Sequence, residues 1–200
     1  MPETGLAERT GAFDVRRKQL GSVHAPQTVK TARLTGRRIA ADDLPYLREV
    51  DSDARVQRSL FGKVQTLARS RERLRRWILM WEEDGTGFWL FVDDRGQTIG
   101  HGGLFRSPRE AGEIELGYVV KPAHWGHGFA TEIALRALDV GFTDLALERI
   151  IAIAQARNAE SRHVMEKCGM LFEADLPSPD GVHGVRYAVS RSAWLRGRER

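Results

Sequence analysis

A short glycine-containing loop is the part of the sequence best suited to chemistry. It follows an apolar stretch, precedes a helical one, and comprises Trp125, Gly126, His127, Gly128, Phe129, Ala130 and Thr131. Glycine lets the chain bend tightly and bring backbone N–H groups against an anion. A helix N-terminus adds unsatisfied donors and partial positive charge. The loop therefore predicts a binding site for a phosphate or pyrophosphate group.

Two common nucleotide-binding patterns do not fit this loop. A dinucleotide-binding loop has Gly-x-Gly-x-x-Gly directly after a strand. Here Thr131 replaces the third glycine, and residues 121–125 separate the strand from the glycines. The sequence also has no Gly-x-x-x-x-Gly-Lys-Ser/Thr run. A glycine-rich turn without a ligand is the alternative to a phosphate site.

A second candidate lies at the start of a predicted helix over residues 158–168. Asn158 fits its N-cap, and Ser161, Met165 and Cys168 follow at i, i+4 and i+7. Ser161 thus shares a helix face with two apolar residues and should point inward, where a hydroxyl needs a partner or a role. Alternatively, Ser161 bonds only to the local backbone of the first turn.

Together, the two motifs resemble those of the GNAT N-acetyltransferases. Residues 125–130 resemble the Arg/Gln-Gly-x-Gly-x-Gly/Ala loop of that family. Residues 158–161 with 167–172 resemble its second cofactor motif, Asn-x-x-Ser followed by Lys-x-Gly-Phe. The resemblance is strongest to the RimJ/RimL-type branch and covers residues 30–191. Two departures are a tryptophan before the first glycine, where many members have Arg or Gln, and the lack of a tyrosine on the second-motif helix.

The resemblance implies acetyl-CoA as the acetyl donor. No metal is expected, because the histidines show no HxxxH or similar spacing. Ser161 becomes the candidate acid that protonates the departing CoA thiolate. The Val119 N–H becomes a candidate donor to the developing oxyanion. The residues implied to bind acetyl-CoA are Tyr118, Val119 and Val120 for the pantetheine arm, residues 125–131 for the pyrophosphate, and Asn158 and Ser161 for the arm.

The acceptor must present a neutral amine to the thioester, and two glutamates are candidate bases. Glu113 and Glu115 stand at i and i+2 of a predicted strand over residues 113–120, which places both side chains on one face. Either could relay a proton from the ammonium through water, and we favour Glu115. The alternative for one or both is an exposed cross-strand ion pair.

These features predict an acetyl-CoA-dependent N-acetyltransferase that works by direct attack of a primary amine, with a protein or peptide α-amine as acceptor. An α-amine of pKa ~7.7–8.0 is about one-tenth neutral at pH 7, whereas a lysine near ~10.4 is under roughly 0.1% neutral. A pocket without a strong base therefore favours the α-amine. Alternatives are a small amine, such as an antibiotic or polyamine, and a non-catalytic acyl-CoA-binding module on the same fold.

The elements that position these residues predict one mixed α/β domain around a central sheet of about six to seven strands, and the resemblance implies that this sheet is splayed. Residues 1–30 are expected to be a flexible N-terminal arm, residues 31–191 a GNAT-like domain, and residues 192–200 a basic tail. Strands are expected over residues 31–39, 88–92, 97–105, 113–120, 149–154, 171–174 and 185–189. Helices are expected after an Asp42 or Asp43 cap, over residues 66–82, from Gly128 to about Phe142, and over residues 158–168.

Composition limits the setting and the partners. The 31 Lys and Arg residues against 27 Asp and Glu give a charge of +4, too small an excess to indicate a specific nucleic-acid binder. Cys168 is the single cysteine, which excludes a disulfide framework and favours the cytoplasm. Neither a secretory signal nor a membrane-spanning stretch is expected. The expected partners are acetyl-CoA and the amine acceptor, with a homodimer as one option and no membrane.

An arginine-rich stretch over residues 69–76 is the densest charge cluster. It is either a solvated helix face or a basic wall that attracts an acidic acceptor or the CoA phosphates. Trp77 and Trp81, at i and i+4, either belong to the core or form the wall of an acceptor groove.

Overall fold

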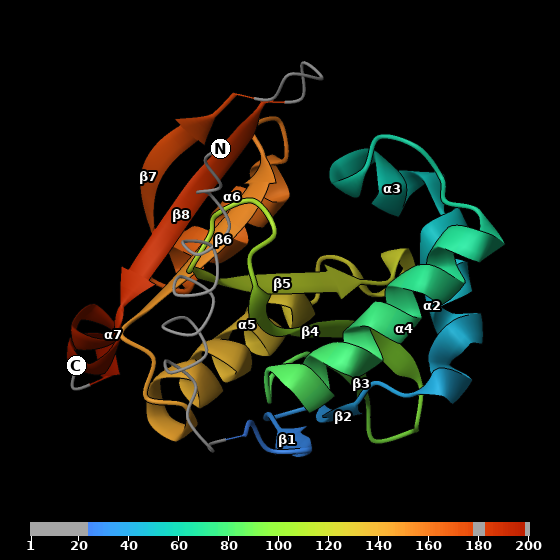
Figure 1. The fold of residues 1–200 in the computed structure, drawn as a ribbon, viewed down its shortest axis with the longest axis horizontal. Helices are drawn as coiled ribbons and strands as arrows, with labels where there is room; N and C mark the ends of the chain where they lie inside the picture. The colour runs from blue at the N-terminus through green and yellow to red at the C-terminus, as the bar shows by residue number, and fades with distance from the viewer. Residues whose placement is uncertain (1–23, 178–182, 199–200) are drawn as a thin grey trace, which may run out of the picture.

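The computed structural model describes residues 24–177 and 183–198. They form an open eight-stranded sheet with helices on both faces (Figure 1). The strand order is β1-β2-β3-β4-β5-β6-β8-β7, and neighbouring strands run antiparallel except for the parallel pair β5 and β6. This confirms the predicted mixed α/β fold around a splayed sheet, with eight strands rather than about six to seven.

The strands and helices have the following bounds. The strands are β1 (Thr28–Lys30), β2 (Thr35–Arg38), β3 (Phe88–Val92), β4 (Thr98–Arg106), β5 (Ile114–Val120), β6 (Arg149–Gln155), β7 (Leu171–Leu176) and β8 (Gly184–Ser190). The helices are α2 (Leu44–Ser52), α3 (Ala54–Leu60), α4 (Leu67–Glu83), α5 (Phe129–Asp139), α6 (Ala159–Lys167) and α7 (Arg191–Arg198).

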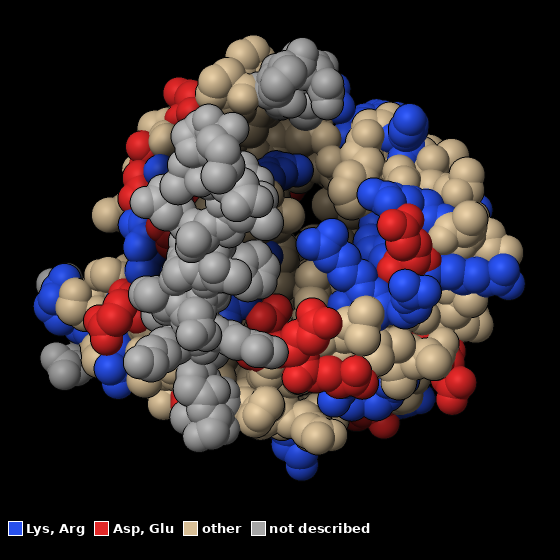
Figure 2. Space-filling model, in the orientation of Figure 1, with Lys and Arg blue, Asp and Glu red and all other residues tan. Residues whose placement is uncertain are grey.

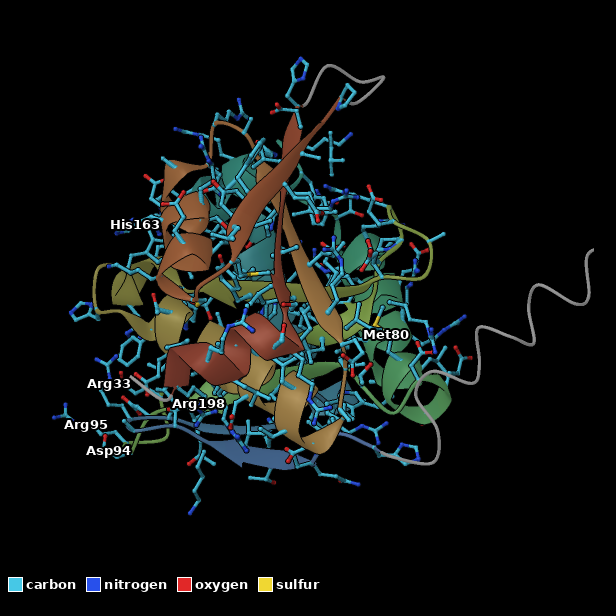
Figure 3. The ribbon with its side chains drawn as sticks, turned by 90° about the vertical axis from the view of Figure 1, so that its left-hand side faces the viewer. Arg33, Met80, Asp94, Arg95, His163 and Arg198 are labelled. Carbon is cyan, nitrogen blue, oxygen red and sulfur yellow. The ribbon has the colours of Figure 1, made fainter. Side chains whose placement is uncertain are left out.

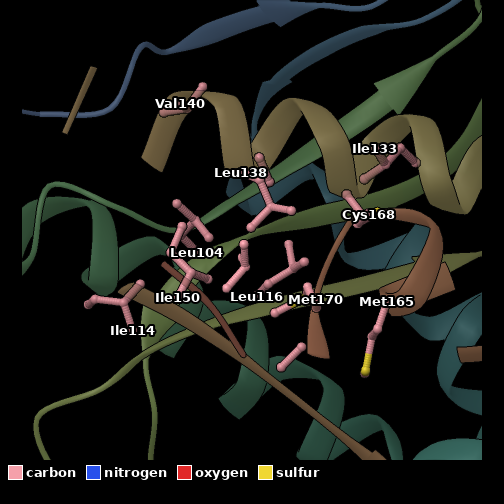
Figure 4. Packing of buried hydrophobic residues seen from close by; sticks show 14 of the residues in the cluster. Leu104, Ile114, Leu116, Ile133, Leu138, Val140, Ile150, Met165, Cys168 and Met170 are labelled. Carbon is pink, nitrogen blue, oxygen red and sulfur yellow. The ribbon is translucent and has the colours of Figure 1, made fainter. Parts of the chain in front are cut away.

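Two apolar clusters hold helices to the opposite faces of the sheet. On one face, Ile133 and Leu138 of α5 and Met165 of α6 are buried in the cluster that includes Leu104 and Leu116 of the sheet (Figure 4). On the other face, α2 and α4 pack over Phe88 and Leu90 of β3. Removal of this apolar surface from water is the main stabilising term. The sheet is therefore a rigid layer between two helical layers.

The junction of β5 and β6 is where the sheet opens. β4 and β5 pair along their whole length, and β6 and β8 do the same. In contrast, β5 and β6 pair only at Glu115 and Ile151. Beyond this pair, residues 116–120 of β5 have no strand partner on the β6 side within the described chain. Backbone groups on such an edge require another hydrogen-bonding partner.

The N-terminal part of the sheet is more elaborate than the single strand expected over residues 31–39. β1 and β2 form a hairpin, and the turn between them is closed by hydrogen bonds from Thr31 to the Leu34 carbonyl. Ala25 and Val29, expected in the arm, are buried in the core, at 4% and 2% exposure. The rest of the arm, residues 1–23, lies outside the described residues. The first stretch of the fold thus begins earlier than residue 31.

Three further local details differ from expectation. Asp43 occupies the N-cap position of α2, as expected, but its side chain makes no capping hydrogen bond, because its carboxylate pairs with Arg37 and accepts from the Ala40 N–H. The short helix α3 was not anticipated. Residues 191–198, expected mostly as a tail, form α7, whose Trp194 ring packs 5.7 Å from the Phe142 ring. The buried Trp194 and the ion pair of Arg198 with Asp139 dock this charged helix.

Candidate active site

The glycine loop has the conformation that its sequence predicts. Gly126 and Gly128 have φ of 78° and 79°, which only glycine adopts readily, and Gly128 is the N-cap of α5. Among the described residues, no acceptor is found for the backbone N–H groups of residues 126–131. Unsatisfied donors at a helix N-terminus fit an anionic group such as a pyrophosphate.

A long-range contact from Arg33 fixes this loop. The Arg33 Nε donates to Glu132 Oε2 at 2.7 Å, and its Nη1 donates to the His127 carbonyl at 3.0 Å. The guanidinium also lies 4.3 Å from the centre of the Phe129 ring. Since Arg33 is about a hundred residues away in sequence, motif reading could not assign it this role. The start of α5 is thereby tied to the β1–β2 hairpin.

The end of β5 leads directly to this loop. The Trp125 Nε1 donates to the Val120 carbonyl at 2.7 Å, while 48% of the residue stays exposed. Tyr118 and Val120 direct their backbone groups toward the β6 side, where this part of β5 has no strand partner. Tyr118 and Val120 therefore lie where an extended amide-containing chain could add to the sheet. Their pairing with pantetheine stays a prediction. Val119 instead pairs with His101 of β4, in register with the Lys121 N–H that donates to the Ile99 carbonyl. Its N–H is therefore already bonded, and the expectation that it stabilises an oxyanion is wrong.

The start of α6 confirms the predicted cap and the predicted inward face. The Ser161 N–H donates to Asn158 Oδ1 at 3.1 Å. Met165 and Cys168, on the same face as Ser161, are each 2% exposed. Burial raises the pKa of the Cys168 thiol to about 12, so this cysteine is a core residue that stays protonated.

Asn158→Ala should lower the free energy of unfolding by on the order of 1 kcal/mol, because the Ser161 N–H loses its acceptor. Chemical denaturation measures this change, and Asn158→Asp, which keeps a capping oxygen, is the control. If Asn158→Ala loses stability but binds acetyl-CoA as well as the unmodified protein, Asn158 is a cap and has no role in holding the cofactor arm.

A tyrosine from the neighbouring strand reaches Ser161. The Tyr118 hydroxyl lies 3.0 Å from Ser161 Oγ and donates to the Ser161 carbonyl at 3.0 Å. Burial raises the pKa of Tyr118, so the phenol keeps its proton. The second-motif helix lacks a tyrosine, but Tyr118 of β5 contacts the start of that helix. Sequence reasoning missed this pair because the two residues are 43 positions apart.

Glu115 and Glu113 have different surroundings. Glu115 is 9% exposed, and its Oε2 accepts from Ser107 Oγ at 2.6 Å. Burial raises the pKa of Glu115, and the Ser107 hydrogen bond opposes part of that effect. Glu113 precedes β5, and its carboxylate accepts from Arg149 Nε at 3.2 Å. Since side-chain alternation holds only within a strand, Glu113 takes the ion-pair alternative.

A cleft of about 810 Å³ lies on the α4 side of the sheet. Its floor is formed by alternate residues of β5, namely Glu115, Gly117 and Val119, and by residues 153–155 of β6. Glu113 does not line this cleft. In Figure 3, Met80 of α4, which also lines the cleft, lies on the side of the molecule opposite Arg33. The glycine loop and the cleft thus approach the junction of β5 and β6 from opposite faces.

A buried histidine sits in the same cleft. His101 Nδ1 lies 2.7 Å from the Tyr46 hydroxyl, and burial lowers the pKa of His101 to about 3, so the ring is neutral. Trp77 contributes to the wall beside His101, and both Trp77 and Trp81 are buried.

Over residues 24–177 and 183–198, no group of three or more metal-binding side chains occurs. Within the same residues, none of the helices combines the length and apolar character needed to cross a bilayer.

Comparison with known proteins places these features in context. A family model described as an acetyltransferase (GNAT) domain matches residues 33–171. The FsC-acetyl coenzyme A-N(2)-transacetylase of Aspergillus fumigatus is 27% identical over 196 residues, covering 88% of this chain and 81% of that protein. An uncharacterized N-acetyltransferase, p20, of Bacillus licheniformis is 31% identical over 137 residues, covering 68% of this chain and 77% of that protein.

Solved structures share the fold. An acetyltransferase from Agrobacterium tumefaciens superposes with a TM-score of 0.72 at 26% identity, covering 81% of this chain and 93% of that one. The named acceptors of similar proteins differ. A spermidine N(1)-acetyltransferase of Vibrio cholerae is 32% identical over 84 residues, 42% of this chain and 49% of that protein. A RimL α-N-protein acetyltransferase structure shares only the fold, with a TM-score of 0.70 at 16% identity over 84% of this chain and 98% of that one.

Proposed function

Since the chain belongs to the GNAT family of acetyltransferases, we propose that it transfers acetyl from acetyl-CoA to the α-amine of a protein or peptide by direct attack. N-acetyltransferase activity follows from the family, whereas the route and the acceptor are the proposal. The observation that carries it is the cleft on the α4 side. This cleft meets the junction of β5 and β6 opposite the glycine loop and has a buried carboxylate, Glu115, in its floor.

Each group of residues has a defined task in this proposal. Residues 126–131 hold the pyrophosphate with their backbone N–H groups, and Asn158 holds the cofactor arm. Acetyl-CoA supplies an acetyl group already activated as a thioester. Glu115 takes the proton from the acceptor ammonium through water.

The carboxylates available in the cleft support an α-amine. The acidic residues that line the cleft are Glu115 and Glu72, and Glu72 pairs with Arg69 at 2.6 Å. One weak base can deprotonate an ammonium of pKa ~7.7–8.0 far more readily than a lysine near ~10.4. The RimJ/RimL-type resemblance of the sequence agrees with this acceptor. A polyamine is the second candidate, because a similar protein is named a spermidine acetyltransferase.

An acceptor screen with detection of the released CoA thiol tests the proposal. Peptides with a free α-amine should release thiol, whereas the same peptides with a blocked N-terminus and an internal lysine should not. Release by spermidine alone would favour the polyamine acceptor. Binding of acetyl-CoA with no release for any amine would indicate a non-catalytic acyl-CoA-binding module. A cytoplasmic setting, supported by a single, buried and unpaired cysteine, and a homodimer stay predictions.

Ser161→Ala should lower kcat by roughly tenfold to a hundredfold and leave acetyl-CoA affinity nearly unchanged. The Ser161 hydroxyl lies next to the protonated Tyr118 phenol and can deliver a proton to the departing thiolate. The expected loss is at the low end for general acids, because a thiol of pKa ~8.5 is already a fair leaving group. Steady-state kinetics measure both constants.

Ser161→Thr keeps the hydroxyl and is the matched control, which should retain most of the activity. A Ser161→Ala enzyme with unchanged kcat would remove the acid role. A variant that fails only in acetyl-CoA binding would make Ser161 a residue that positions the cofactor.

A further inference from the structure

Resting on the proposed α-amine acceptor, we propose that the cleft selects acceptors with carboxylates near the amine, that is, N-termini followed by acidic residues. The cationic residues that line the cleft are Lys63, Arg69, Arg73, Arg76 and Arg109, and the acidic ones are Glu72 and Glu115. A cleft with an excess of one charge sign concentrates ligands of the other sign.

The arginines of α4 are sorted by helix face. Arg69, Arg73 and Arg76, at i, i+4 and i+7, line the cleft, whereas Arg71 and Arg75 on the same helix do not. This spacing places the first three on one side of the helix. Lys and Arg side chains gather over α4 and beside the hollow at the centre of the molecule (Figure 2). The basic wall is therefore a property of the cleft face, rather than of the helix as a whole.

Much of this positive charge is not neutralised by the protein. Arg69 pairs with Glu72, and Arg73 pairs with Asp51. Within the described part of the chain, no carboxylate forms a salt bridge with Arg76, Arg109 or Lys63. Three lining cations are thus available to an acidic ligand.

The central arginine is built into the cleft wall. Asp51, which is fully buried, accepts from Ser70 Oγ at 2.7 Å and pairs with Arg73, whose guanidinium lies 5.2 Å from the Trp77 ring centre. Among the described residues, the buried Arg73 Nε–H has no hydrogen-bond acceptor. A buried carboxylate is tolerated only when it is well paired. The Asp51 contact therefore holds Arg73 in a fixed place beside the acceptor path.

The proposed donor site does not account for these cations. The phosphate-binding features, residues 126–131 and the α5 N-terminus, approach from the opposite face of the sheet. A polyamine, with several positive charges, would be repelled by the same wall. A peptide with Asp or Glu after its first residue would place carboxylates along it, in reach of forked N–H donors.

Three peptides of equal length with the same first residue test this selection. They continue with acidic, neutral or arginine-rich sequence, so that the α-amine is the only acceptor. The expected kcat/KM order is acidic, neutral, basic, and the preference should weaken as salt is added. Equal kcat/KM for all three would overturn the selection but leave the proposed function intact. No acetylation of any peptide, with acetylation of spermidine, would overturn the proposed acceptor itself.

A matched pair of variants locates the effect. Arg76→Glu should lower kcat/KM for the acidic peptide on the order of tenfold and reduce the preference. Arg75→Glu changes the charge equally on the same helix, outside the cleft, and should leave kcat/KM unchanged. The KM for acetyl-CoA should be the same in both variants. Equal effects of the two variants on kcat/KM would overturn the assignment of Arg76 to acceptor selection. A KM for acetyl-CoA that rises only in Arg76→Glu would also overturn it, because Arg76 would then bind the CoA phosphates.

Discussion

Gly128→Asp should lower the affinity for acetyl-CoA by about a hundredfold or more. Gly128 is the N-cap of α5, at the centre of the unsatisfied N–H groups of residues 126–131. An aspartate there places a negative charge where the pyrophosphate is expected. Its carboxylate can also accept from the same N–H groups and so compete with the phosphate oxygens from within the chain. Calorimetry with acetyl-CoA measures the affinity.

A second glycine controls for strain and charge. Gly96, in the turn between β3 and β4, has φ of 74° and open space at its Cβ position, and Gly128 has φ of 79° with only Arg33 nearby. Gly96→Asp should therefore fold and bind acetyl-CoA normally. If Gly128→Asp binds as tightly as Gly96→Asp, the pyrophosphate is not on this loop.

Features that depend on a few neighbouring residues could be predicted from the sequence. The glycine loop, the Asn158 cap and the inward face of Ser161 each follow from local spacing, and the structure has all three. Local backbone preference and side-chain periodicity decide such features almost alone. The hairpin of β3 and β4 was predictable for the same reason, since its turn lies within four residues.

Features that depend on the meeting of distant segments could not be predicted in this way. Tyr118 reaches Ser161, and Arg33 reaches Glu132, only because strands and helices far apart in sequence pack together. Glu113 illustrates a boundary effect, because β5 begins one residue after it and strand alternation no longer applies. Helical spacing groups Arg69 with Arg73, but only packing shows that their face lines a cleft. Tertiary contacts, and not local propensity, complete the site.

Glu115→Gln should lower kcat/KM on the order of a hundredfold near pH 7. The amide cannot take the proton from the acceptor ammonium. The variant can therefore acetylate only the fraction of acceptor whose amine is already neutral in solution. For the unmodified enzyme, activity should fall as the pH drops through the raised pKa of Glu115. In the variant, this fall should move up to the pKa of the acceptor, ~7.7–8.0. The deficit should therefore shrink above about pH 8.

The same substitution should leave the fold intact. Because burial raises the pKa of Glu115 above its ordinary value of 4.5, the folded state favours the protonated form. The stability from that protonation is fully present below the ordinary pKa and is lost as the pH rises through the folded pKa. A neutral glutamine, which can still accept from Ser107 Oγ, should make the protein at least as stable at pH 7. Thermal denaturation at pH 5 and pH 7 measures this.

Glu113→Gln is the matched control, since it removes a carboxylate from the same segment outside the cleft. It should keep its activity and the pH profile of the unmodified enzyme, because Glu113 pairs with Arg149 and does not reach the acceptor path. If Glu115→Gln keeps full activity at pH 7, or if its deficit is the same at pH 7 and pH 9, Glu115 is not the base. In that case water alone takes the proton, and the buried carboxylate serves only to accept the hydrogen bond from Ser107.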